Sequence, residues 1–404
     1  MSKKYHFTKF GFAYKMQGLT IKLYIMTKRK MLSNLCKTAL FCVVATMFNV
    51  SFARDVWTPK QANDWYSKLP YLAGVNYVPS YAVNGIELWS DETFDIKTIE
   101  HEFKLLKSIN MNCIRLFLND QVHRHNPEAF YAKMQQVLDL CDKYDIYVMF
   151  TFYSNGGRPE GKLGKQPEPI AGKHNSQWVK CPTLSVLGDE SKWGYLKDYV
   201  QGTVKRFANN PRIIWDIFNE PGNIPSSHVP GQKNMGKDEY VNYIFNTKKL
   251  MEKSFEWARS ANPTQPLTAC VWECDKFTDT IFAESSLTNS DIITYHCYES
   301  VVKHTKFINR LKQYKKPIMC TEWLARQCGS TFDPILQFLK ANKVGSFSFG
   351  LKQGKIQTHL AWPWFLKSGL KGVDDIWFHD IFDSNDKPYS QEEVAYIKRI
   401  LSEK

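Results

Sequence analysis

The sequence of 404 residues lacks the spacing patterns with which proteins commonly hold a metal ion. It contains no Cys-x-x-Cys and no His-Glu-x-x-His string, and His123 and His125 have no partner at ligand spacing. We therefore expect neither a metal ion nor another cofactor. Ten cysteines are present, but several of them fall inside apolar runs, where cysteine behaves as a small buried hydrophobe. We therefore expect mostly free thiols.

Acidic residues are missing from the first 53 positions, which carry nine lysines and arginines. This segment holds most of the net charge of +13, because the rest of the chain has 44 basic and 40 acidic residues. A nucleic-acid partner is therefore not indicated. Within the segment, a basic string at 28–30 precedes an apolar run over 39–48 and a small-x-small string at 51–53. This order is typical of a cleaved secretory signal.

Long apolar runs are also missing, since the run over 39–48 is too short to form a stable membrane span. We expect residues 1–53 to be a leader and the mature protein to be secreted or periplasmic. Residues 1–25 are an unusual extension of such a leader, and Met26 or Met31 would each give an ordinary start.

No proline-rich linker, repeat or shift of composition divides residues 54–404, so we expect one domain there, and a monomer. Short β-rich runs alternate with longer helical patterns throughout this part. The order implies parallel strands with right-handed crossovers, and closing that sheet gives an α/β fold, the (β/α)₈ TIM barrel. A doubly wound open sheet is the alternative. Strands are expected at 73–77, 113–118, 147–152, 213–218, 267–272, 292–297, 318–321 and 346–351. Helices are expected at 96–109, 127–143, 193–208, 239–261, 302–314, 334–342 and 391–400.

Three long segments, 154–191, 222–237 and 352–387, follow the third, fourth and eighth expected strands. Loops at the carboxyl end of barrel strands build the binding site of such a fold. Two apolar strings in the chain end on a glutamate, Glu220 after 215–219 and Glu322 after 318–321. Two carboxyl groups delivered to the same end of one barrel are what double-displacement sugar chemistry requires.

With these residues in order, the chain resembles a clan of retaining β-glycosidases that includes glycoside hydrolase family 5, the cellulase and mannanase family. The similarity covers about residues 71–365. The string Asn219-Glu220-Pro221 is similar to the acid/base motif of the family, in which the asparagine bonds the 2-hydroxyl of the substrate. Glu322 matches the nucleophile. Retention requires the two carboxyl groups to lie about 5–5.5 Å apart.

The resemblance assigns supporting roles to residues on two other strands. Arg115 matches the arginine that keeps the nucleophile ionised, and the string His296-Cys297-Tyr298 is similar to a His-x-Tyr motif whose tyrosine bonds the nucleophile. These neighbours imply that the pKa values of the two glutamates separate, one low and one raised.

Aromatic residues near the ends of strands are candidates for stacking on sugar faces. Trp362 is the preferred candidate, because the polar stretch 352–359 leads to it, and Trp364 is close to it in sequence. Other tryptophans at or after strands are Trp89, Trp178 and Trp272. Two positions depart from the family pattern. No histidine ends the third strand, and Phe349 stands where a tryptophan commonly lies under the reacting sugar.

The sequence thus predicts an exported, cofactor-free retaining hydrolase of β-linked glycans. Glu220 and Glu322 are its expected catalytic residues, and Arg115, Asn219, His296, Tyr298, Phe349 and Trp362 its expected substrate-binding residues. Two alternatives remain open: a carbohydrate-binding barrel with impaired catalysis, and a transglycosylase that uses the same covalent intermediate. The sequence leaves open which glycan is bound, and whether the cut is internal or terminal.

Overall fold

The computed structural model describes residues 53–223, 236–272, 281–367 and 376–403. Contacts divide the chain into residues 1–52 and residues 53–404. The expected leader, apart from its last residue, therefore lies outside the described residues, as do parts of the expected loops 222–237 and 352–387. Among the described helices, none combines the length and the apolar character needed to cross a membrane.

Nine parallel strands form one sheet, in the order β5-β4-β3-β2-β1-β9-β8-β7-β6. The sheet closes because β5 and β6, at its two edges, are consecutive pieces of one segment, separated only by Ala269. The predicted eight-stranded (β/α)₈ barrel is confirmed, with its fifth strand in two short parts. The strands are β1 (Ala73–Asn76), β2 (Cys113–Phe117), β3 (Tyr147–Ser154), β4 (Ile213–Asn219), β5 (Leu267–Thr268), β6 (Cys270–Val271), β7 (Ile293–His296), β8 (Ile318–Trp323) and β9 (Gly345–Phe349).

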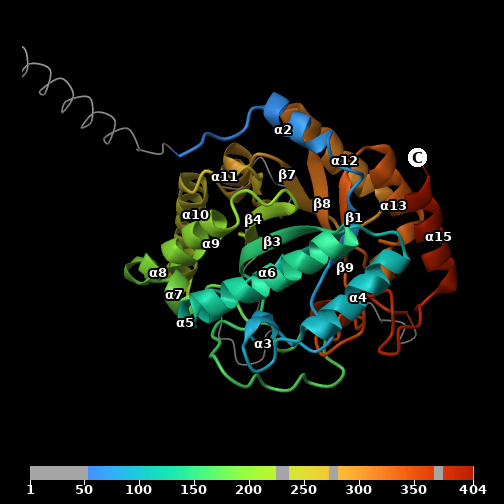
Figure 1. The fold of residues 1–404 in the computed structure, drawn as a ribbon, viewed down its shortest axis with the longest axis horizontal. Helices are drawn as coiled ribbons and strands as arrows, with labels where there is room; N and C mark the ends of the chain where they lie inside the picture. Colours follow the sequence, from blue (N-terminus) through green and yellow to red (C-terminus); the bar gives the residue numbers. More distant parts are fainter. Residues whose placement is uncertain (1–52, 224–235, 273–280, 368–375, 404) are drawn as a thin grey trace, which may run out of the picture. The chain divides into compact units, whose positions relative to one another are not determined.

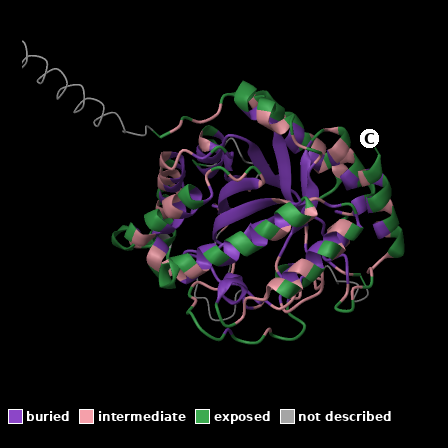
Figure 2. Cartoon of the chain, in the orientation of Figure 1, coloured by how far each residue is buried: buried purple, intermediate pink, exposed green. Residues whose placement is uncertain are grey.

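Helices surround the strands, and the longer ones, such as α4 (Ile96–Ser108) and α6 (Pro127–Tyr144), carry both buried and exposed residues along their length (Figures 1 and 2). The expected helix over 193–208 is interrupted, because one wide π turn, η2 (Asp198–Gly202), lies between two short helices. The helices are α2 (Pro59–Tyr66), α3 (Gly85–Trp89), α4 (Ile96–Ser108), α5 (Asp120–His125), α6 (Pro127–Tyr144), α7 (Leu184–Leu187), α8 (Gly194–Lys197), α9 (Thr203–Arg206), α10 (Lys237–Ser260), α11 (Ile281–Asn289), α12 (Val301–Leu311), α13 (Phe332–Ala341), α14 (Pro363–Lys367) and α15 (Gln391–Ser402). Short 3₁₀ turns are η1 (Glu190–Lys192), η4 (Lys312–Tyr314) and η5 (Arg326–Cys328).

Alternate residues of each strand face the barrel axis, as a pleated strand requires. The inward residues near the amino ends of β2, β3 and β4 are apolar. Two positions further along, the inward side chains are polar and buried: Arg115, Thr151 and Asp216. Asp216 accepts hydrogen bonds from both Arg115 and Thr151. Buried polar groups need partners, so this layer sets the carboxyl end apart from the packed core below it. The apolar cluster nearer the amino end contains Cys113, Met149, Ile214, Ile292, Met319 and Phe347.

Helix α2 covers the amino end of the barrel, opposite the long loop that follows β3 (Figure 1). Its buried Ala62 belongs to the apolar cluster at the amino end of the strands, and Trp65 packs against that cluster. The helix begins with a capping box, in which Thr58 and Gln61 bond each other's backbone amides. Arg54 fixes the preceding chain through an ion pair with the buried Asp291, at 2.5 Å.

No disulfide joins the seven cysteines of the described residues to one another, and six of these cysteines are buried. Cys274 lies outside the described residues. Burial raises the pKa of Cys141 and of Cys113, so these groups stay protonated at neutral pH and act as packing side chains.

Candidate active site

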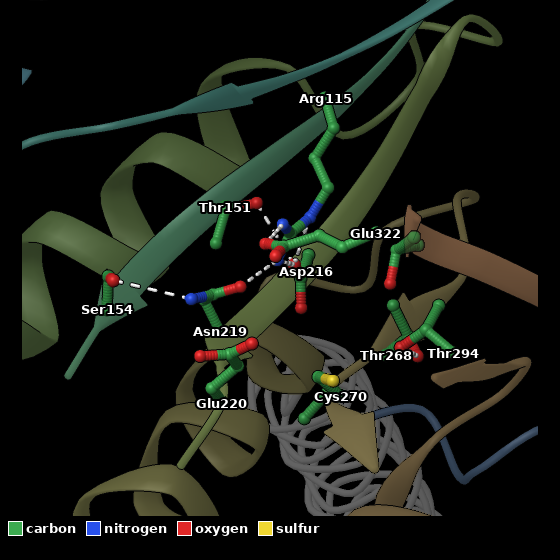
Figure 3. A network of polar contacts seen from close by, with 12 residues as sticks. Arg115, Thr151, Ser154, Asp216, Asn219, Glu220, Thr268, Cys270, Thr294 and Glu322 are labelled. Carbon is green, nitrogen blue, oxygen red and sulfur yellow. Dashed lines mark hydrogen bonds and ion pairs between the residues drawn. The ribbon is translucent and has the colours of Figure 1, made fainter. Parts of the chain in front are cut away.

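Arg115 lies at the centre of the polar layer and joins four strands (Figure 3). Its guanidinium is completely buried and donates to Asp216 Oδ2 from Nη2 at 2.6 Å and from Nε at 3.0 Å. It also donates to Glu322 Oε1 at 2.8 Å, Asn219 Oδ1 at 2.7 Å and Asn76 Oδ1 at 2.9 Å. One cation facing two carboxylates in a dry interior fixes the positions of all of these groups.

Asp216 and Asn76 are functional candidates that sequence reasoning missed. Asp216 stands alone as a charged residue within the apolar run of β4, and Asn76 ends β1. The inward position of Asp216, two residues beyond the apolar Ile214, was the available signal. A lone charge on the inward face of a buried strand needs a buried partner, and here that partner is Arg115.

Glu322 lies on β8, and both of its carboxylate oxygens are held. Oε1 accepts from Arg115, and Oε2 accepts from the hydroxyl of Tyr298 at 2.7 Å. Burial raises the pKa of Glu322, and the charge of Glu220 adds to the rise, while Arg115 and the Tyr298 hydrogen bond oppose it. These contacts orient the carboxylate and favour its ionised form against the cost of burial.

Glu220 follows β4 directly and has a left-handed backbone, with φ of 47°. A residue other than glycine rarely adopts this conformation, and such strain is concentrated at functional sites. Its Oε2 accepts from Asn223 Nδ2 at 2.7 Å, and its Oε1 lies 2.7 Å from His296 Nδ1. Burial raises the pKa of Glu220 to about 7. The pKa values of both glutamates are thus raised, and the expected separation into one low and one raised value is not found.

His296 lies on β7 between the two glutamates. Its Nδ1 is 2.7 Å from Glu220 Oε1 and 3.5 Å from Glu322 Oε2. Burial lowers the pKa of His296 to about 4, so the ring is neutral at physiological pH. A neutral ring can donate one hydrogen bond from Nδ1 to Glu220 without adding a positive charge to the site.

The two glutamates face each other across the barrel, since β4 and β8 lie on opposite sides of it. One oxygen of each carboxylate and one nitrogen of His296 lie within 4.8 Å of one another. Among the described residues, this is the group whose spacing also suits a metal ion. All four carboxylate oxygens already have hydrogen-bond partners, and a divalent cation would lie beside the Arg115 guanidinium. The arrangement therefore fits a pair of reacting carboxyl groups better than a metal site.

A cavity of about 720 Å³ opens above this pair and is lined by residues from the loops at the carboxyl end of the strands. Trp362 lies edge-on to Tyr298, with ring centres 4.9 Å apart, and stacks on Trp364 at 5.2 Å. Phe349 also lines the cavity, with its ring centre 6.5 Å from that of Tyr298. Asn219, whose Nδ2 donates weakly to Ser154 at 3.4 Å, completes the wall beside Arg115.

The remaining tryptophans that the sequence suggested divide into two groups. Trp178 and Trp272 line the cavity, and so does Trp364, which is 48% exposed. Trp89 is fully buried away from the cavity, and its indole nitrogen donates to the carbonyl of Phe117 at 2.8 Å. Its assignment as a sugar-stacking residue is wrong, because it packs between helices instead.

Residues 73–354 match the family model described as cellulase (glycosyl hydrolase family 5). No curated protein sequence matches the chain. Among solved structures, GH5_18 from Streptomyces cattleya, in complex with GlcNAc, has a TM-score of 0.52 at 12% identity, covering 82% of this chain and 81% of that one. The exo-β-1,4-mannosidase Op5Man5 from Opitutaceae bacterium strain TAV5 has a TM-score of 0.50 at 12% identity, covering 82% of this chain. The chain spans 59% of the length of that mannosidase.

At these identities the structural likeness shows the barrel fold, whereas the family match spans well over half of the chain and contains the Arg115 network and both glutamates. The chain belongs to glycosyl hydrolase family 5 and is a glycoside hydrolase.

Proposed function

We propose that this glycoside hydrolase cleaves β-glycosidic bonds with retention of configuration, in an exported form that lacks residues 1–53. Glu322 is the nucleophile and Glu220 is the general acid and then the general base. The observation that carries the proposal is a pair of carboxyl groups at the base of one cavity, buried Glu322 and partly buried Glu220, with one oxygen of each within 4.8 Å of the other. This separation suits direct attack by one carboxylate and leaves no room for a water between the two groups.

In the first step, a lone pair of Glu322 forms a bond to the anomeric carbon, while the bond to the glycosidic oxygen breaks. Glu220 gives its proton to that departing oxygen, and its pKa of about 7 leaves it substantially protonated near neutral pH. In the second step, Glu220 accepts a proton from water, whose oxygen attacks the anomeric carbon and releases Glu322. Two inversions restore the original configuration.

The neighbouring residues keep Glu322 oriented as the nucleophile and Glu220 oriented as the proton donor. Arg115 and Tyr298 hold both oxygens of Glu322, so its attacking lone pair has a fixed direction. Asn219, held by Arg115, presents its amide to the 2-hydroxyl of the reacting sugar. The neutral ring of His296 holds Glu220. Phe349 and Trp362 offer aromatic faces to the sugar.

The proposal is tested by the anomeric configuration of the first product, followed by NMR with aryl β-glucosides, aryl β-mannosides and β-linked oligosaccharides. Retention is the expected result, and an inverted product would refute the mechanism. Glu322→Ala should abolish hydrolysis. Glu220→Gln should lower the rate on unactivated substrates by about 10²–10⁴-fold. It should leave unchanged the rate at which the glycosyl group is transferred to Glu322 from a leaving group that needs no proton.

Glu128→Gln is the matched control, because the side chain of Glu128 is 78% exposed and lies on helix α6, away from the cavity. Full activity of Glu322→Ala would contradict the assignment. Binding of oligosaccharides by the wild-type protein without any cleavage would instead favour a carbohydrate-binding barrel. Sugar products longer than the substrate would show that an acceptor sugar competes with water.

A further inference from the structure

Three loops at the mouth of the barrel are joined to one another by hydrogen bonds. They follow β1, β3 and β9 and comprise residues 77–90, 154–183 and 350–361, which we call the wall. The bonds that join them are Asn84 Nδ2 to Gln166 Oε1 (2.9 Å) and to Gln177 O (3.0 Å), Lys355 N to Ser80 O (3.0 Å), Lys355 Nζ to Glu87 Oε1 (2.8 Å), Asn175 N to Ile356 O (2.8 Å) and Gln357 Nε2 to Ile170 O (2.8 Å).

The wall is also packed. Gly354 lies so close to the neighbouring loop that a Cβ added there would come within 2.5 Å of Ser80 Cα. Ile356 packs with Trp178 and the β2 residue Phe117 in one buried cluster. Buried His174 bonds the Leu360 carbonyl at 2.8 Å. These contacts give the wall the character of a fixed structural element rather than of independent loops.

The position of the wall relative to the reacting pair decides which part of a substrate it meets. The wall rises over the arc β9-β1-β2-β3, on the side where Asn219 is bonded to Arg115 and Ser154. Glu220 is bonded toward the other arc, to His296 on β7. Under the proposed mechanism, the sugar whose 2-hydroxyl meets Asn219 lies on the side of the wall, and the leaving group that Glu220 protonates lies on the side of β7.

Asn175 is the polar residue of the wall best placed to recognise that sugar. It lines the cavity, and its backbone amide is fixed to the carbonyl of Ile356. Its Oδ1 is buried and has no hydrogen-bond partner among the described residues. Its backbone is left-handed, with φ of 48°, a conformation that asparagine tolerates better than most residues. A buried polar atom without a partner is costly unless a ligand supplies one.

We propose that the wall closes the non-reducing side of the site, so that the enzyme removes a unit of fixed size from the non-reducing end of β-linked chains, with Asn175 bonding a hydroxyl of the terminal sugar. This inference rests on the proposed function. It adds the direction of attack, since a site closed on the glycone side admits a chain end and rejects the middle of a chain.

The test uses β-linked oligosaccharides labelled at the reducing end, in two forms: one with a free non-reducing end and one whose terminal sugar carries a bulky acetal. We expect the free form to shorten in constant steps from the non-reducing end and the blocked form to resist cleavage. Internal cleavage of both forms would overturn this inference but would still support the proposed hydrolase activity. Failure to cleave the free form and aryl glycosides alike would instead reject the proposed function.

Two glycine variants test the wall itself. Asn175→Gly removes the side chain but keeps the left-handed backbone, and we expect kcat/KM on the free oligosaccharide to fall about tenfold. Lys343→Gly is the matched control, because Lys343 has a φ of 57° and is exposed between α13 and β9, at the amino end of the barrel. We expect it to match the wild type. Unchanged kcat/KM in Asn175→Gly would show that the side chain of Asn175 does not bond the terminal sugar.

Discussion

At the scale of single residues, the active site depends on one buried cation that serves two carboxylates. Arg115 is surrounded by groups that would each be costly to bury alone, namely Asp216 and Glu322. Removal of one partner leaves the others with uncompensated charge, so the network should fail as a unit. This coupling links the stability of the barrel to the position of the nucleophile.

Asp216→Asn tests that coupling. We expect the free energy of unfolding to fall by about 3 kcal/mol, because Arg115 keeps a single carboxylate partner in a dry interior. Unfolding in urea measures the change. Asp142→Asn is the control, since Asp142 pairs with Arg212 on the surface with its side chain 59% exposed, and a change within about 0.5 kcal/mol is expected. Equal losses in the free energy of unfolding of the two variants would show that the buried Arg115–Asp216 pair stabilises the fold no more than a surface ion pair does.

The raised pKa of Glu220 predicts the alkaline limb of the pH profile. The acid must carry its proton in the first step, and burial holds its pKa at about 7. The rate on substrates with poor leaving groups should therefore fall about tenfold for each pH unit above that value. Steady-state rates measured across the pH range provide the check, and Glu220→Gln should lack this limb. A wild-type rate that stays flat to high pH would contradict the assignment.

The same shift has a consequence for stability. The pKa of Glu220 in the folded protein lies above the value of about 4.3 for an unfolded glutamate, so the folded state binds this proton more tightly. The protonation of Glu220 therefore contributes fully to the stability of the folded protein below a pH of about 4.3, and this contribution is lost as the pH rises through about 7. We expect the Tm of the wild type to fall relative to that of Glu220→Gln over this window. A constant difference between the two Tm values would rule out the shift.

At the scale of elements, the amino end of the barrel is built for stability. Helix α2 packs there through Ala62 and Trp65, and its capping box starts the helix. Thr58→Ala removes the side-chain acceptor of the cap, so we expect a loss of about 1 kcal/mol in the free energy of unfolding. Because α2 lies at the end away from the cavity, kcat/KM should not change.

Lys60→Ala is the control for the cap, since its side chain is 83% exposed and its ion pair with Asp64 lies on the surface. Calorimetry of both variants, combined with activity assays, measures the two effects. A drop in kcat/KM for Thr58→Ala under conditions where the protein is fully folded would contradict the separation of the two ends.

The elements also show what the sequence can and cannot predict. Strands such as β2 and β4 were predictable because they are short, apolar and followed by helices of clear period. The split of the fifth strand at Ala269 and the π turn η2 were not, because each is a local change in hydrogen bonding that barely alters the hydrophobic pattern. Likewise Trp89 could not be assigned to the core, since its environment depends on helix α6.

At the scale of the whole molecule, the site residues that motifs carry were predictable and their mutual contacts were not. Glu220, Glu322 and Tyr298 stand in recognisable strings, and the structure brings them to one cavity. Asp216 and Asn175 stand in no motif, and only the folded chain places them beside Arg115 and in the cavity. The joining of three loops into the wall was equally hidden, because its bonds connect residues far apart in sequence.

The proposed cleavage of residues 1–53 gives a prediction at this scale. If the signal is cleaved after Ala53, the mature chain begins at Arg54, whose guanidinium pairs with buried Asp291 and bonds the Gln265 carbonyl. If the protein is exported as proposed, mass spectrometry of the protein recovered outside the cytoplasm should find this terminus. A chain that starts at residue 56 should have a lower Tm than one that starts at 54, because Asp291 loses its ion pair with Arg54. Equal Tm values would show that this contact contributes nothing to the mature protein.

The position of α2 at the far end of the barrel also matters for handling the enzyme. The exposed amine of Lys60 lies on this helix, at the closed end of the barrel. Tethering the protein to a solid support through this helix would point the mouth of the cavity into solution. An insoluble glycan could then reach an immobilised layer of enzyme in the same orientation in which it meets the free molecule.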